Sequence, residues 1–68
     1  MDKIAYFRQY VDSVGGAPKA AARLGLSESM VYHILNGVRG ITPEVALRVE
    51  QDSEGAFSKT ILVWGAVA

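Results

Sequence analysis

Apolar residues recur at intervals of three and four along this chain, which is the spacing typical of amphipathic helices. A first helix is predicted over residues 2–14. Its apolar stripe consists of Ile4, Phe7, Val11 and Val14. Asp2 can cap the start of this helix, and Gly15-Gly16 predicts its end.

Residues 17–36, with the sequence APKAAARLGLSESMVYHILN, predict two short helices joined by a tight turn. The helices are expected over 18–24 and 28–36. Gly25 suits the turn, because glycine adopts a positive φ without a steric penalty. Ser27 can then cap the second helix by accepting from an unpaired backbone N–H group.

The contact between these two helices is predicted from small and branched apolar residues. Ala20 and Ala21 allow the second helix to cross closely over the first. The shared apolar seam is expected to contain Leu24, Leu26, Val31 and Ile34. A helix-turn-helix unit of this kind commonly places its second helix in the DNA major groove, so the segment indicates DNA binding.

A further helix is predicted over 43–52 from Thr42-Pro43-Glu44, which combines a capping hydroxyl, a proline and an early acid. Its buried side is expected to carry Val45, Ala46 and Val49. Leu47 points the opposite way and is expected to be an isolated exposed leucine.

The C-terminal segment fits two structures. Ser58 can cap a short helix over 59–63, whereas residues 60–64 have equally good strand composition. We favour the helix for residues 58–68. The expected fold is therefore all-α, with four to five helices in one domain over residues 1–68.

Composition agrees with a small folded domain, because half of the 68 residues are apolar. The chain contains no cysteine, which excludes disulfides and suits a reducing cytoplasm. The sequence MDKIAYFRQY resembles neither a secretory nor a transit peptide, and no apolar run is long enough to span a bilayer. We therefore expect a cytoplasmic protein.

The net charge is zero, and this is the main argument against nucleic-acid binding. The charges are nevertheless segregated, because residues 17–40 carry a net +2 and the remainder carries −2. The positive part therefore coincides with the predicted helix-turn-helix. So few cations predict few phosphate contacts per subunit and weak DNA binding by a monomer.

The segment GGAPKAAARLGLSESMVYHILNGVRGITPEVALRVEQDSEGAFSKTIL resembles the Cro-type phage repressors and the related YdaS-like antitoxin family. The resemblance covers residues 15–62, and its most specific elements are AAARLGLSESMVYHILNG and ITPEVALRVEQ. It implies a compact helical domain that binds operator DNA, usually as a two-fold dimer, in a phage or bacterial regulatory circuit. Cro proteins differ in their C-terminal half, some helical and some β-stranded. Here the ending ILVWGAVA departs from the polar, proline-containing stretch of the helical members.

The outward face of the second helix of the pair would meet base edges in a major groove. Spacing from Gly25 places on that face Ser27, Glu28, Ser29, Tyr32, His33 and Asn36. Glu28 can accept from cytosine N4, Asn36 can pair with adenine, and Tyr32 can contact a thymine methyl group. For three of these residues a purely structural role is the alternative to DNA contact. Ser27 can serve as an N-cap, Glu28 as a solvated first-turn acid and Asn36 as a helix C-cap.

Three basic residues are predicted to contact phosphates. Lys19 and Arg23 lie four residues apart and so share one face of the first helix of the pair, which crosses the DNA backbone in this type of complex. The alternative is that they form an ordinary solvated pair. Arg39 lies in a glycine-flanked loop directly after the second helix and is the strongest candidate of the three.

The apolar residues Ile61, Leu62, Val63, Trp64 and Val67 have two interpretations. They close the core over Phe7 and Val11, or they form part of a homodimer interface, since an exposed apolar patch would otherwise be a liability. Both can hold at once.

Other function classes find less support. With one histidine, no cysteine and no P-loop motif, we expect neither an enzyme nor a metal or cofactor site. The main alternative is a protein-interaction module, such as an antitoxin-type domain that binds a partner protein. Zero net charge and the apolar C-terminal end favour it.

Overall fold

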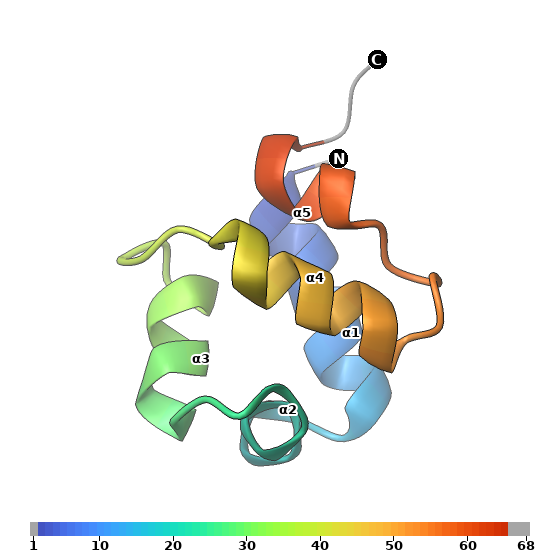
Figure 1. Ribbon diagram of the computed structural model, residues 1–68. Coiled ribbons are helices and arrows are strands. Elements are labelled where there is room, and N and C mark those ends of the chain that lie inside the picture. The colour runs from blue at the N-terminus through green and yellow to red at the C-terminus, as the bar shows by residue number, and fades with distance from the viewer. Residues whose placement is uncertain (1, 66–68) are drawn as a thin grey trace.

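The computed structural model describes residues 2–65, and this part of the chain folds into five helices (Figure 1). They are α1 (Lys3–Val14), α2 (Ala17–Leu24), α3 (Glu28–Leu35), α4 (Pro43–Asp52) and α5 (Lys59–Trp64). The predicted all-α fold is confirmed. The strand alternative for residues 60–64 is wrong, because a strand would need a neighbouring strand for its backbone groups and residues 2–65 provide none.

Local capping sets most helix boundaries, as predicted. Three side chains accept from a backbone N–H group in the first turn of their helix: Asp2 from Ile4 (3.2 Å), Ser27 from Met30 (3.1 Å) and Thr42 from Val45 (3.2 Å). Gly15 and Gly25 end α1 and α2 in the left-handed conformation. The predicted boundaries of α2 and α3 shift by one residue, since α2 begins at Ala17 and α3 ends at Leu35.

The start of α5 differs in detail from the prediction. Ser58 is the N-cap residue, but its side chain makes no capping bond. Its backbone N–H group instead donates to the Tyr6 hydroxyl at 2.7 Å. The ring of Phe57 packs edge-on against the rings of Tyr6 and Tyr10, with centroids 5.2 and 5.6 Å apart. The link from α4 to α5 is therefore fastened to α1.

The core contains the predicted seam between α2 and α3. Leu24, Val31 and Ile34 are almost fully buried, as are Ala20 and Ala21, while Leu26 is partly buried against the same cluster. Leu62 is fully buried in this cluster together with Phe7 and Val11, so α5 does close the core. Val67 lies outside the described residues.

The arrangement leaves α3 at one edge of the molecule. In Figure 1, α2 is seen end-on and α3 stands upright beside it, so the two helices cross steeply. Helix α3 packs against α2 and α1, and α5 packs against α1 and α4. One long side of α3 therefore faces outward. Among residues 2–65, every helix is too short or too polar to cross a membrane.

Candidate functional site

The outward side of α3 carries the residues predicted to contact bases. Val31 and Ile34 are buried against the core, whereas Tyr32 is 47% exposed and His33 is exposed. This alternation follows from the helical repeat, which turns neighbouring positions to different sides. The predicted outward orientation of Tyr32 and His33 is confirmed. Contact between these residues and DNA stays a prediction.

The two ends of α3 place the remaining base-contact candidates. Glu28 and Ser29 are exposed in the first turn, beside Ser27. The Ser27 oxygen accepts from the Met30 N–H group, so the capping role predicted for it is confirmed, and its hydroxyl hydrogen remains a donor. Asn36 is exposed and is the C-cap residue, as its alternative interpretation predicts.

The candidate phosphate contacts differ in their surroundings. Arg23 Nη1 donates to both carboxylate oxygens of Asp52, at 3.0 and 3.3 Å, so its charge is neutralised inside the chain. In the described part of the chain, the side chains of Lys19 and Arg39 form no hydrogen bond or ion pair. When Arg23 is left out of the sum because Asp52 neutralises it, the net charge of residues 17–40 falls from +2 to +1.

Lys19 lies against the end of α1. Its Cδ atom would be only 2.8 Å from a Cβ atom added to Gly15, which means that its aliphatic stem passes over that glycine. Gly15 is the C-cap of α1, so the ammonium group lies near the negative end of this helix. Lys19 is nonetheless exposed and is the more available cation of α2.

Arg39 is held beside the end of α3 by the backbone. The N–H groups of Val38 and Arg39 both donate to the carbonyl of His33, at 2.9 and 3.2 Å. The loop therefore folds back on the last turn of α3. Arg39 also borders a hollow of about 350 Å³ between the end of α3 and the start of α4, with Met30 and Val45 among its walls.

Two arginines that the sequence analysis did not single out support this pair of helices. Arg48 Nη1 donates to the carbonyl of Leu24 at 2.8 Å, and Arg8 Nη2 donates to the carbonyl of Leu35 at 3.3 Å. These are the last carbonyls of α2 and α3, which lack partners within their own helices. Each bond therefore fixes one end of the α2–α3 unit to a neighbouring helix.

Only part of this arrangement has a signal in the sequence. Glu44 and Arg48 are four residues apart in α4, a spacing that predicts their ion pair, and Arg48 Nη2 does donate to Glu44 at 2.8 Å. The bonds to Leu24 and Leu35 join positions 24 and 27 residues apart. Such separations depend on the tertiary fold and are not visible in a local pattern.

A polar contact inside the molecule ties α1, α2 and α4 together. The buried Tyr10 donates its phenolic hydrogen to Asp52 at 2.8 Å, and Asp52 also accepts from Arg23. Burial, and then the hydrogen bond and negative charge of Asp52, raise the pKa of Tyr10 well above its usual value, while Arg23 opposes the shift. Tyr10 therefore stays a neutral donor at physiological pH.

Among residues 2–65, no group of three or more histidine, cysteine, aspartate or glutamate side chains converges to form a metal site.

Comparison of the chain with models of known protein families, with curated proteins and with solved structures finds no match. The resemblance to Cro-type repressors and YdaS-like antitoxins therefore stays a prediction.

Proposed function

We propose that this chain is a sequence-specific DNA-binding transcriptional regulator, similar to a Cro repressor, that places α3 in the major groove of a palindromic operator. The proposal rests on the exposure of polar and aromatic side chains along the outward side of α3. Tyr32 and His33 project from a helix whose other side is buried, and a three-residue turn joins that helix to α2. This is the geometry in which a helix-turn-helix presents side chains to base edges.

The side chains proposed to contact DNA divide into two groups by chemistry. The first group has donors, acceptors and an aromatic ring that suit base edges: Ser27, Glu28, Ser29, Tyr32, His33 and Asn36. The second consists of cations for phosphates, of which Lys19 and Arg39 are available without breaking an internal contact. Arg23 would first have to leave Asp52, so we expect it to contribute least.

So small a set of cations makes a monomer a weak DNA binder. A two-fold homodimer doubles the phosphate contacts and places two copies of α3 roughly 34 Å apart, one helical turn of DNA. We therefore propose a homodimer on a palindromic site, acting in the cytoplasm of a bacterial cell at the nucleoid. The chain would then be a binding protein and not an enzyme.

Selection of bound duplexes from a random pool tests the proposal directly. A recovered palindrome supports it and fixes the half-site spacing. Failure to enrich any sequence, together with no binding to random duplex DNA at about 50 mM salt, would contradict it, because electrostatic binding is strongest at low salt.

Two variants separate the two groups of contacts. Arg39→Ala is expected to weaken binding to all sequences and to reduce the slope of log K against log salt by about 1. Tyr32→Ala is expected mainly to reduce the discrimination between operator and random DNA. Lys3→Ala, at the start of α1, is the charge-matched control and should change neither. Equal loss of discrimination from the first two variants would contradict this assignment.

A second candidate function is that the same face binds a partner protein, such as a toxin. The internal pairing of Arg23 with Asp52 favours it, since it reduces the charge available to phosphates. A salt titration separates the two functions. DNA binding predicts a steep negative slope on random duplex, and a protein-interaction module predicts no binding.

A further inference from the structure

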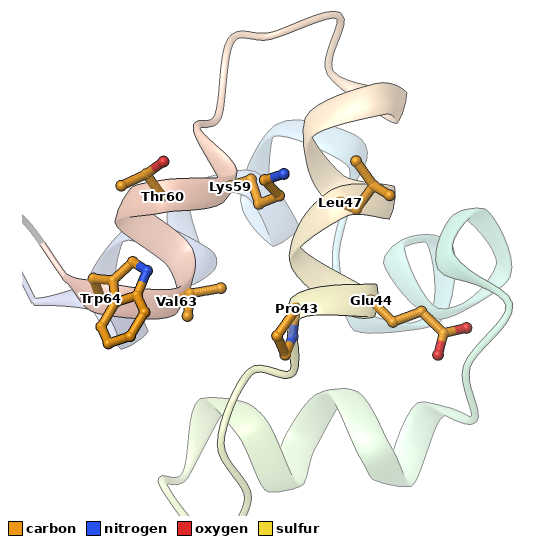
Figure 2. A pocket seen from close by; sticks show the side chains of 7 residues that line it. All are labelled: Pro43, Glu44, Leu47, Lys59, Thr60, Val63 and Trp64. Atoms are coloured by element: carbon orange, nitrogen blue, oxygen red, sulfur yellow. The ribbon is translucent and has the colours of Figure 1, made fainter.

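An apolar groove of about 440 Å³ runs between α4 and α5 (Figure 2). Its walls are Pro43, Glu44, Leu47, Lys59, Thr60, Val63 and Trp64. In Figure 2, Val63 points from α5 toward α4, and the indole of Trp64 stands at one end of the groove. None of the residues predicted to contact DNA borders it.

The groove changes the interpretation of two predictions. Leu47 is 40% exposed, but it is not isolated, because it lines the groove together with side chains of α5. Of the five residues predicted for the core or a homodimer interface, Val67 lies outside the described residues, and Leu62 belongs to the chain's own core and is unavailable to a partner. Ile61 and Val63 are partly buried, and Trp64 is 78% exposed. The patch available to a partner is therefore Trp64 and the groove beside it.

We propose that the groove is where a second copy of this chain binds, with the Trp64 indole of each copy inserted between α4 and α5 of the other. The inference rests on the proposed homodimer and assigns its interface. In a two-fold interface the same patch meets itself, so that patch must contain both a projection and a recess. Trp64 is the projection and the groove is the recess. Tryptophan is also among the residues that contribute most to protein interfaces.

The charges around the groove favour a second copy over an unrelated partner. Glu44 on α4 and Lys59 on α5 have opposite signs and both border the groove. A two-fold axis that places Glu44 opposite the partner's Lys59 also creates the reciprocal pair. The Glu44 side chain is 74% exposed and uses only Oε1 for Arg48, so Oε2 is free to accept from a second cation. Zero net charge also means that two copies do not repel each other over long range.

The position of the groove is compatible with the proposed function. It is formed by α4 and α5, whereas the predicted base contacts lie on α3 and its two flanking residues. Association through the groove therefore leaves the outward side of both copies of α3 free. Because the patch is small beside the roughly 800 Å² per partner of a standard interface, we expect a weak, concentration-dependent dimer.

Sedimentation of the full chain without DNA tests this proposal separately from DNA binding. The chain is expected to be monomeric at low concentration and dimeric at high concentration. Trp64→Ala should raise the dimer dissociation constant about 30-fold, as expected for a residue that dominates an interface. Tyr32→Ala removes an exposed aromatic ring from α3 instead and should leave the dissociation constant unchanged. Circular dichroism checks that each variant is folded.

A charge exchange tests the two-fold register. Glu44→Lys should weaken the dimer, because it places two ammonium groups opposite each other, and the double variant Glu44→Lys with Lys59→Glu should restore it. A wild-type chain that is monomeric at every concentration would overturn the proposal. A dimer unaffected by Trp64→Ala, or one that the double exchange fails to restore, would overturn it as well. The two proposals fail separately: a palindrome recovered from the random pool by a chain that sediments as a monomer would overturn the groove as the interface and leave DNA reading by α3 standing.

Discussion

The helix pairs α2–α3 and α4–α5 present surfaces of different chemistry. In the first pair the apolar side chains close on each other, and the outward side of α3 carries hydroxyl, imidazole, carboxylate and amide groups. In the second pair an apolar groove stays open between the helices, with Trp64 at its end. The first surface matches a polar, charged partner such as DNA, and the second matches an apolar one.

The connections within the two helix pairs also differ. A turn of three residues joins α2 to α3, with Gly25 in the left-handed conformation and Ser27 as the next cap. The link between α4 and α5 has six residues, and its aromatic side chain Phe57 is held by α1. Helix α5 is therefore positioned by α1 as well as by α4.

The largest expected effect compares one leucine from each pair. Leu24→Ala should destabilise the monomer by about 2–5 kcal/mol, because it empties a fully buried position in the α2–α3 seam. Leu47→Ala is the matched control and should change stability by less than about 0.5 kcal/mol, since Leu47 lies in the open groove. Urea unfolding at low protein concentration measures both. Equal losses would contradict the contrast between a closed and an open pair.

The next effect concerns Tyr10, which joins α1 to Asp52 at the end of α4. Because the folded protein raises the pKa of Tyr10, the stability that this group contributes is complete below the unfolded pKa of about 10 and falls as pH rises above it. One such group changes the free energy of unfolding by at most about 1.4 kcal/mol per pH unit. Tyr10→Phe should therefore flatten the loss of stability between about pH 10 and 11, measured by urea unfolding at each pH.

Tyr32→Phe is the control for this alkaline effect, because Tyr32 is exposed on α3 and its hydroxyl has no hydrogen-bond partner in the described part of the chain. It should keep the wild-type dependence of stability on pH. A Tyr10→Phe profile that matched the wild type would show that the buried phenol does not couple the stability of the fold to pH in this range.

A smaller effect tests how α2 is held against α4. Arg48→Met removes the bond to the last carbonyl of α2 and should cost about 1 kcal/mol of stability. Arg39→Met changes an exposed arginine whose side chain has no hydrogen bond or ion pair within residues 2–65, and it should stay within about 0.5 kcal/mol of the wild type. Thermal unfolding compares the two. If both variants behaved alike, Arg48 would have no special role in supporting the α2–α3 unit.

Sequence reasoning succeeded where the determinants are local. The caps at Asp2, Ser27 and Thr42 and the turn at Gly25 depend on a few neighbouring residues, so each was predictable. The outward orientation of Tyr32 followed from the helical repeat once α3 was assigned. These features define the candidate site on α3.

It failed where the determinants are distant in the sequence. The apolar stripe predicted for α1 omitted Tyr10, because its burial depends on Asp52 and on packing against Phe57. The groove between α4 and α5 depends on the path of residues 53–58, and no periodic pattern fixes that path. At the C-terminal end the favoured helix is confirmed by α5, but the local pattern left a strand open, and only the absence of a neighbouring strand in the described residues excludes it.

The claim that α3 presents a DNA-binding face is tested most directly by following backbone amide resonances during titration with a random-sequence duplex at about 50 mM salt. DNA binding through α3 predicts that the largest shifts fall on α3 and on Arg39, with little change along α5. Shifts confined to the groove between α4 and α5, or no shifts at all, would contradict it.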